Sequence, residues 1–199
     1  MPTSHTVTTI YNMALDIVSE RPCSGPSDTG RAEVRWLNRN YVHYVQVALR
    51  ENLWNFATEL HYLSRGTDPA FRWSYAYDLP NGWLRVIPLT RYGARNEEII
   101  PHEIRSGQIV TSELGGADGL PVELVMDRQD PGEWDPLFAA LIAARLAVGL
   151  AHAFTHKRSF VDAAKQAAVD ALNSAEMANA YEGTMPPVEQ HDVIRARYR

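Results

Sequence analysis

The sequence predicts an α+β fold: a four-helix bundle with a small antiparallel β domain inserted between the second and third long helices, plus an extended C-terminal arm. Three observations predict it. Apolar residues recur every three or four positions over residues 8–20, about 28–53, 135–156 and 159–182, the period of amphipathic helices. Residues 54–130 instead carry short alternating apolar runs separated by Gly and Pro, which is typical of strands. Pro186 and Pro187 then follow the last helical segment and favour an extended chain.

The composition is that of a folded protein and narrows the range of functions. The chain is 45% hydrophobic and 22% charged, and its 199 residues are enough for one domain or for one domain that carries a smaller inserted one. The net charge of −5 disfavours a general polyanion binder, because phosphate contacts require clustered Lys and Arg. A DNA-facing role stays open, since a channel through which DNA slides should be neutral or acidic. Cys23 is the only cysteine, so no intramolecular disulfide can form, and we expect no signal peptide at the N-terminus.

Two helices are expected before residue 54. The first covers residues 8–20 and ends in the Pro- and Gly-rich stretch 21–30. The second is expected from about Asp28 to Leu53, with Asp28 or Thr29 as its N-cap. Its predicted inner face consists of Val34, Leu37, Tyr41, Tyr44, Val45, Ala48 and Leu49.

The middle of the chain predicts a small antiparallel sheet of four to six strands. After Trp54 the apolar period changes from 3.6 to 2, and Trp54 and Phe56 show a strand spacing. Further strands are expected within residues 82–89, 102–114 and 120–129, the second of these as a hairpin that turns at Ser106-Gly107. The alternating aromatic row favours the core of a sheet over a base-stacking platform, which would be interleaved with more cations. That row consists of Phe71, Trp73, Tyr75 and Tyr77.

Two further helices are expected after the strands. Asp135 followed by Pro136 combines an N-cap with proline at the first helical position, so a helix should run from there to about His156. Its apolar stretch is interrupted by Arg145 and His152, which favours a buried helix over a membrane span. The final helix is expected over about 159–182, ending at Gly183. Its alanine-lined face suits close packing on another helix or on a neighbouring subunit.

Motifs for catalysis are weak. The sequence has no phosphate-binding glycine loop and no nucleophile elbow, and Cys23 lies in a loop without a neighbouring His. His152 and His156 are four residues apart, but the residue after the first is Ala153, where a zincin has Glu. The acidic residues around the last strand are interpreted as caps and solvated groups, with a magnesium nuclease as the alternative. They are Asp127, Asp130, Glu133 and Asp135. We therefore expect no catalytic residue, metal or cofactor.

Residues 184–199 combine apolar anchors with cations. Three arginines occur in the last five residues, loosely alternating with apolar side chains. A solvated tail is one interpretation. The other is a tether that becomes ordered on an acidic, grooved partner. The residues concerned are Val193, Ile194, Arg195, Arg197, Tyr198 and Arg199.

Four stretches occur in a distinctive order. They are "YNMALDIVSE" at 11–20, "LRENLWNFATEL" at 49–60, "WSYAYDLPNGWLRV" at 73–86 and "WDPLFAALIAARLAVGLAHAFT" at 134–155. Their order and spacing resemble the head-to-tail adaptors, also called tail tubular protein A, of short-tailed bacteriophages. The loop "SERPCSGPSD" departs from that family, where a Gly-Glu and a Pro-Ile pair are more usual.

The resemblance implies a structural virion protein made in the host cytoplasm. It implies a homo-oligomeric ring, usually of twelve copies, between the portal and the tail nozzle or tube protein. This ring would line the channel for double-stranded DNA, without sequence-specific binding. It would make no contact with a membrane. Residues 1–53 and 134–183 would form the helical bundle domain, residues 54–133 the inserted β domain facing the tail, and residues 184–199 the portal-docking arm. Trp54, Phe56 and Trp134 would be seam residues between the two domains.

Two alternatives stay open at the level of sequence. One is a metal-dependent nuclease or hydrolase associated with the head-tail junction. The other is a monomeric binding module that forms no ring.

Overall fold

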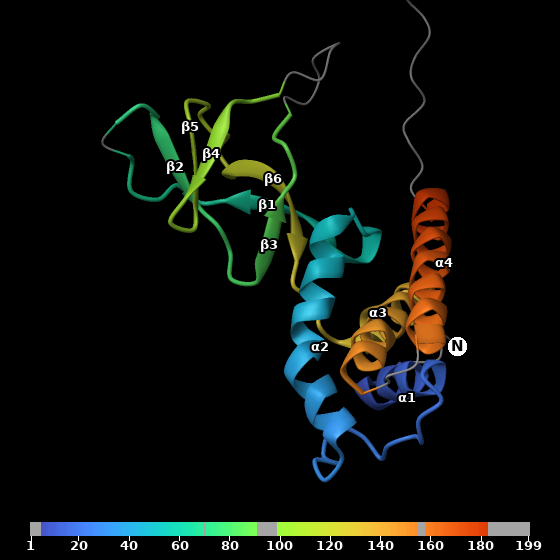
Figure 1. The fold of residues 1–199 in the computed structure, drawn as a ribbon. Helices are drawn as coiled ribbons and strands as arrows, with labels where there is room; N and C mark the ends of the chain where they lie inside the picture. Colours follow the sequence, from blue (N-terminus) through green and yellow to red (C-terminus); the bar gives the residue numbers. More distant parts are fainter. Residues whose placement is uncertain (1–4, 70, 91–98, 155–157, 183–199) are drawn as a thin grey trace, which may run out of the picture.

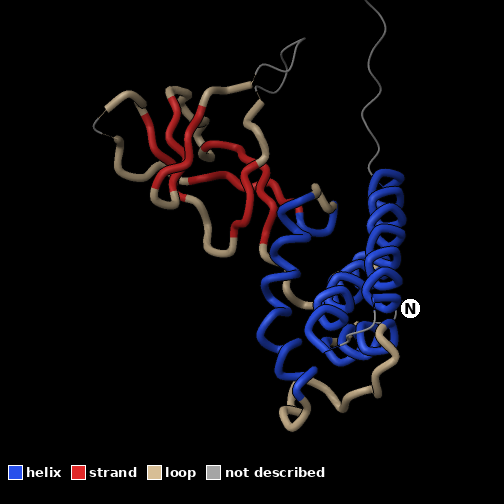
Figure 2. Tube along the Cα trace, in the orientation of Figure 1, coloured by secondary structure: helices blue, strands red, loops and turns tan. Residues whose placement is uncertain are grey.

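The helices and the strands of this protein gather in separate parts of the molecule. The computed structural model describes residues 5–69, 71–90, 99–154 and 158–182. Within them the chain is α+β, with four α-helices and two small antiparallel sheets. Figure 1 gives the order of the elements, and Figure 2 shows the strands grouped to one side of the helices. All six strands lie between the second and third helices in sequence.

Helix α3 (Pro136–Phe154) is the central helix and contacts the other three. Its predicted start is confirmed, because the Leu137 amide donates a 2.7 Å hydrogen bond to Oδ1 of Asp135. Judged by length and composition alone, α3 is the one described helix that could cross a membrane. About half of that segment, 56%, is buried against the rest of the protein.

The helices α1 (Val7–Ile17) and α2 (Ala32–Glu51) pack on α3. The predicted inner face of α2 is confirmed at six of its seven positions, with Tyr44 only partly buried. The predicted cap at Asp28 or Thr29 is wrong, because α2 begins at Ala32. The guanidinium of Arg35 binds the carbonyls of Thr29 and Gly30, which holds this stretch as a turn outside the helix.

Helix α4 (Arg158–Glu182) packs along α3. Its start and end agree with the predicted range, and Thr155, His156 and Lys157 lie outside the described residues. The predicted alanine face is buried less than expected. Only Ala164 and Ala175 are fully covered, so much of this long helix faces solvent.

The strands form two three-stranded sheets in place of the single sheet that was predicted. The first sheet has the order β1-β6-β3 and the second has the order β2-β5-β4. The chain passes from the second sheet to the first near Gly119, whose φ is +116° and where a Cβ would lie 2.6 Å from the carbonyl oxygen of Leu63. A side chain does not fit there, so glycine permits the crossing. The strands are β1 (Thr58–Leu63), β2 (Tyr75–Asp78), β3 (Trp83–Val86), β4 (His102–Arg105), β5 (Gln108–Thr111) and β6 (Leu120–Met126).

The predicted hairpin is confirmed, and the predicted aromatic strand is wrong in part. Ser106 and Gly107 join β4 to β5 with φ of 49° and 77°, the two positive angles that a two-residue hairpin turn requires. In the aromatic row, strand β2 begins only at Tyr75. Phe71 is 80% exposed, and Arg72 has a positive φ of 73°, which interrupts an extended chain.

Two hydrophobic clusters divide the core. The larger consists mainly of residues from the four helices and includes Trp54, Trp134 and one strand residue, Val125. The smaller lies among the strands and includes Tyr77, Ile109 and Leu124.

Candidate functional site

Three predicted seam residues meet at one phenylalanine of α3. The ring centroid of Phe138 lies 5.0 Å from that of Trp54, 4.9 Å from that of Phe56 and 5.1 Å from that of Trp134. All three pairs are edge-to-face, the arrangement that aromatic quadrupoles favour. We call these four residues the junction cluster. It lies where the chain leaves the helices after α2 and returns to them before α3.

Local hydrogen bonds fix the two tryptophans. The indole N–H of Trp54 donates to the carbonyl of Ala48 at 2.8 Å, and that of Trp134 donates to the carbonyl of Arg128 at 2.7 Å. Both are largely buried, with 2% and 6% of their surface exposed, so each buried N–H has the partner it needs.

The strand spacing expected at Trp54 and Phe56 is wrong. Residues Asn55–Ala57 form a single 3-10 turn, and strand β1 begins only at Thr58. The Thr58 hydroxyl donates to the Trp54 carbonyl at 2.9 Å, which stabilises the turn. The two aromatic rings still approach each other, with centroids 6.5 Å apart.

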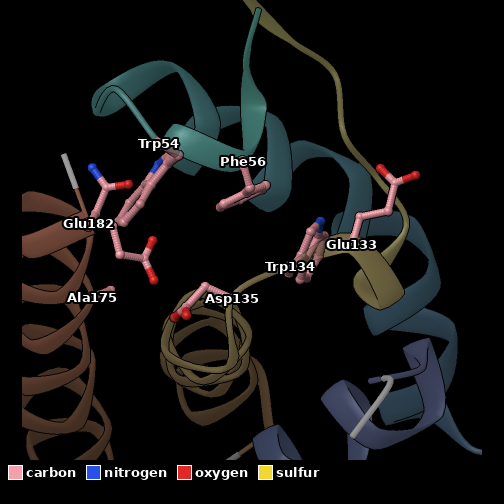
Figure 3. A pocket seen from close by; sticks show the side chains of 8 residues that line it. Trp54, Phe56, Glu133, Trp134, Asp135, Ala175 and Glu182 are labelled. Carbon is pink, nitrogen blue, oxygen red and sulfur yellow. The ribbon is translucent and has the colours of Figure 1, made fainter. Parts of the chain in front are cut away.

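A pocket of about 220 Å³ lies beside the junction cluster. Figure 3 shows its side chains coming from the turn after α2, from the segment before α3 and from the end of α4. Aromatic rings form one part of its wall, and carboxylates form another. The lining residues are Trp54, Phe56, Glu133, Trp134, Asp135, Ala175, Asn179 and Glu182.

Asparagines attach α4 to the turn that follows α2. The Asn179 side chain accepts from the Asn55 amide at 2.8 Å and donates to the Leu53 carbonyl at 2.7 Å. The Asn55 side chain donates in return to the Asn179 carbonyl at 2.9 Å. Asn52 adds a 2.8 Å hydrogen bond to Glu176. The sequence prediction missed this attachment, because the partners are about 124 residues apart and asparagine has no periodic signal.

Polar side chains join α2 to strand β6 and its continuation. The Gln46 amide donates to Asp127 at 2.8 Å, and Gln129 donates to the same carboxylate at 2.7 Å. The Tyr41 hydroxyl donates to the Gln129 carbonyl at 3.4 Å, and burial raises the pKa of this phenol well above its usual range. Burial likewise raises the pKa of Tyr11 to about 12, with a smaller contribution from the nearby Cys23. Both phenols therefore stay neutral at physiological pH and act as hydrogen-bonding groups.

An ion pair joins β1 to the segment after β6. Arg128 pairs with Glu59 and, at 3.4 Å, with Glu133. The hydrogen bond from Arg128 is the main cause that lowers the pKa of the Glu59 carboxyl. His61 also lies 3.2 Å from Glu59.

The predicted acidic cluster is distributed over structural roles. Asp127 accepts from Gln46, Asp130 accepts from the Gly132 amide at 2.9 Å, Glu133 pairs with Arg128, and Asp135 caps α3. Among the residues that the structure describes, no group of three or more His, Cys, Asp or Glu side chains is placed to hold a metal ion.

The other candidates fall in different places. Cys23 is buried, and the Asn12 side chain binds its backbone N–H and carbonyl, so the loop around it is fixed. His152 is exposed on α3, and His156 lies outside the described residues. The six predicted portal-docking residues also lie outside them: Val193, Ile194, Arg195, Arg197, Tyr198 and Arg199.

No protein-family model matches this chain, and no curated protein sequence matches it.

Proposed function

We propose that the chain is a head-to-tail adaptor of the tail tubular protein A type. It is a structural protein, without enzymatic activity, that forms a ring between the portal and the tail nozzle or tube. The ring lines the channel through which double-stranded DNA leaves the capsid. Its place in the virion is the head-tail junction.

The observation that carries this proposal is the order of the four family-like stretches along the elements. Residues 11–20 cover most of α1, and residues 49–60 run from the end of α2 through the 3-10 turn into β1. Residues 73–86 span β2 and β3, and residues 134–155 correspond to α3. Each stretch thus coincides with an element or a transition between elements, which favours a shared architecture over a chance set of apolar runs.

We propose the finer architecture on the same grounds. Residues 1–53 and 134–183 form the four-helix bundle domain, and residues 54–133 form the inserted β domain. The separate hydrophobic clusters support this division, as does the junction cluster, where Trp54, Phe56 and Trp134 each contact Phe138. Residues 184–199 are the portal-docking arm. Glu182, at the end of α4, lines the pocket.

A ring adaptor acts through shape and repeated weak contacts. All the arms of a ring bind the same partner, so the affinity of the whole ring is far above that of a single arm. The arm carries three arginines and the apolar Val193, Ile194 and Tyr198, a combination suited to an acidic groove.

Deletion of residues 186–199 tests the proposal. Full-length and truncated protein are mixed with the cognate portal ring, and binding is measured by sedimentation. We expect the truncated protein to keep its melting temperature and to lose portal binding. A second variant replaces Arg195, Arg197 and Arg199 with alanine, and we expect a weaker loss that grows with salt concentration. Unchanged portal affinity after the deletion would contradict the assignment of the arm.

A further inference from the structure

Two exposed helix faces lie on opposite flanks of the helical part of the molecule. Figure 1 shows α2 and α4 on either side of α3, and both pack their buried residues toward it. Their outer faces are therefore directed away from each other. These two faces cannot contact each other within one chain, but the α2 face of one copy can contact the α4 face of another copy.

The outer face of α2 is basic with exposed apolar residues. Helical spacing places Arg39, His43 and Arg50 along one ridge opposite the buried residues. Val42 and Val47 flank the ridge and are 40% and 37% exposed. Arg39 has no ion-pair partner among the described residues, so its charge is available to a partner.

The carboxylates of α2 do not offset this charge on the ridge. Glu33 pairs with Arg31 at 3.6 Å, and Glu51 pairs with Arg145 of α3 at 2.5 Å. The two carboxylates of α2 are thus engaged away from the ridge, and the Asp127 carboxylate from the segment after β6 lies beside it, hydrogen-bonded to Gln46 at 2.8 Å.

The outer face of α4 carries exposed apolar residues and two carboxylates, Asp162 and Asp170, of which Asp162 pairs with Arg158 at 3.7 Å. Helical spacing places Asp162, Val169, Asp170 and Met177 opposite the buried Ala164 and Ala175. Val169 and Met177 are 52% and 59% exposed.

Beyond Met177, Tyr181 is 84% exposed on the same half of α4. Across its length α4 carries four carboxylates (Asp162, Asp170, Glu176 and Glu182) against two cations (Arg158 and Lys165). The Asp170 carboxylate accepts a hydrogen bond from Gln166 at 2.9 Å and forms no ion pair with another residue that the structure describes.

We propose that the outer face of α4 on one copy docks on the basic face of α2 on the next copy. Because the two faces differ and lie on opposite flanks, the contact is head-to-tail, and repeating it generates a ring when the rotation closes. Val169 and Met177 pack against Val42 and Val47, while Asp170 and Arg39 fix the register through opposite charges. This inference rests on the proposed adaptor function and names the surfaces by which the copies join.

Charge reversal tests the pairing. Asp170→Arg and Arg39→Glu, each alone, should weaken self-association of the full chain at least about tenfold, because each places like charges together. The double variant should restore it, since the pair is then reversed. Asp118→Arg serves as the matched control, because Asp118 is exposed on a turn between strands and far in sequence from both helices. Association is followed by sedimentation velocity over a concentration series, with melting temperatures to verify folding.

Cysteine cross-linking provides a second measurement that detects weak association. The variants Arg39→Cys and Asp170→Cys are oxidised separately and as a mixture, with the buried Cys23 replaced by serine in both. We expect the mixed disulfide between unlike variants to form faster than either symmetric dimer. Equal rates for all three products, or no rescue by the double charge reversal, would overturn the proposed surfaces. If rings still form on the portal in that case, the adaptor function stands and the copies join elsewhere.

Discussion

Replacing Phe138 with alanine removes the residue on which the junction cluster is built. Phe138 is fully buried, and its ring makes edge-to-face contacts with Trp54, Phe56 and Trp134 at centroid distances of 4.9 to 5.1 Å. Truncation of a buried phenylalanine costs about 3–5 kcal/mol of the free energy of unfolding. In a chain of this length about 1 kcal/mol corresponds to roughly 2–4 °C, so the melting temperature should fall by roughly 6–20 °C.

The measurement is unfolding by heat and by urea, followed by circular dichroism for the helices and by tryptophan fluorescence for the cluster. Leu137→Ala is the matched control, because Leu137 is the preceding residue on α3 and is 38% exposed. We expect the control to lose about 1 kcal/mol or less. If Phe138→Ala were no more destabilising than Leu137→Ala, the junction cluster would not hold the two parts of the chain together.

Three further predictions concern separate contacts. Asn179→Ala removes the two hydrogen bonds that its side chain forms with the turn after α2, so the free energy of unfolding in a urea titration should fall by about 1–3 kcal/mol. Asn173→Ala, on the exposed side of α4, should change little. Gly149→Ala should lower the melting temperature although alanine has the better helix propensity, because the new Cβ would lie 2.2 Å from the Trp36 ring. A higher melting temperature would contradict this and show that the Trp36 ring moves aside at little cost. Glu59 has a lowered pKa in the folded state, so its stabilising contribution is complete above about pH 4.3 and is lost as the pH falls through the folded pKa. The melting temperatures of the native protein and Glu59→Gln should therefore differ at neutral pH and converge on acidification, and a constant difference would contradict the pairing with Arg128.

Most elements could be predicted from periodicity and caps. The start of α3 followed from Asp135 and Pro136, and the hairpin followed from Ser106 and Gly107, because these signals depend on only a few neighbouring residues. The division into two sheets could not be predicted. It rests on which strands pair, and the paired strands β1 and β6 are distant in sequence.

The failures at Trp54 and Asp28 have a common cause. A spacing of two residues occurs in a strand, but a 3-10 turn can also bring two aromatic rings onto one partner, here Phe138. Likewise Asp28 is a good capping residue, yet the turn that Arg35 holds lies between it and the helix. Pattern rules describe isolated elements, whereas these outcomes were decided by tertiary contacts.

Sequence reasoning singled out the aromatic residues of the candidate site and missed its polar contacts. Trp54, Phe56 and Trp134 all contact Phe138, and their role as a seam between two domains stays a prediction. The attachment of α4 through Asn55 and Asn179 carried no sequence signal, because exposed asparagines in loops and helices are usually unremarkable.

Electron microscopy of the full-length chain mixed with its cognate portal tests the adaptor account most directly. The account predicts a closed ring of this chain seated on the portal, with α2 of each copy facing α4 of its neighbour and residues 184–199 on the portal surface. Images that show bare portal particles next to monomeric protein, with this chain added in saturating excess over the portal, would contradict the account.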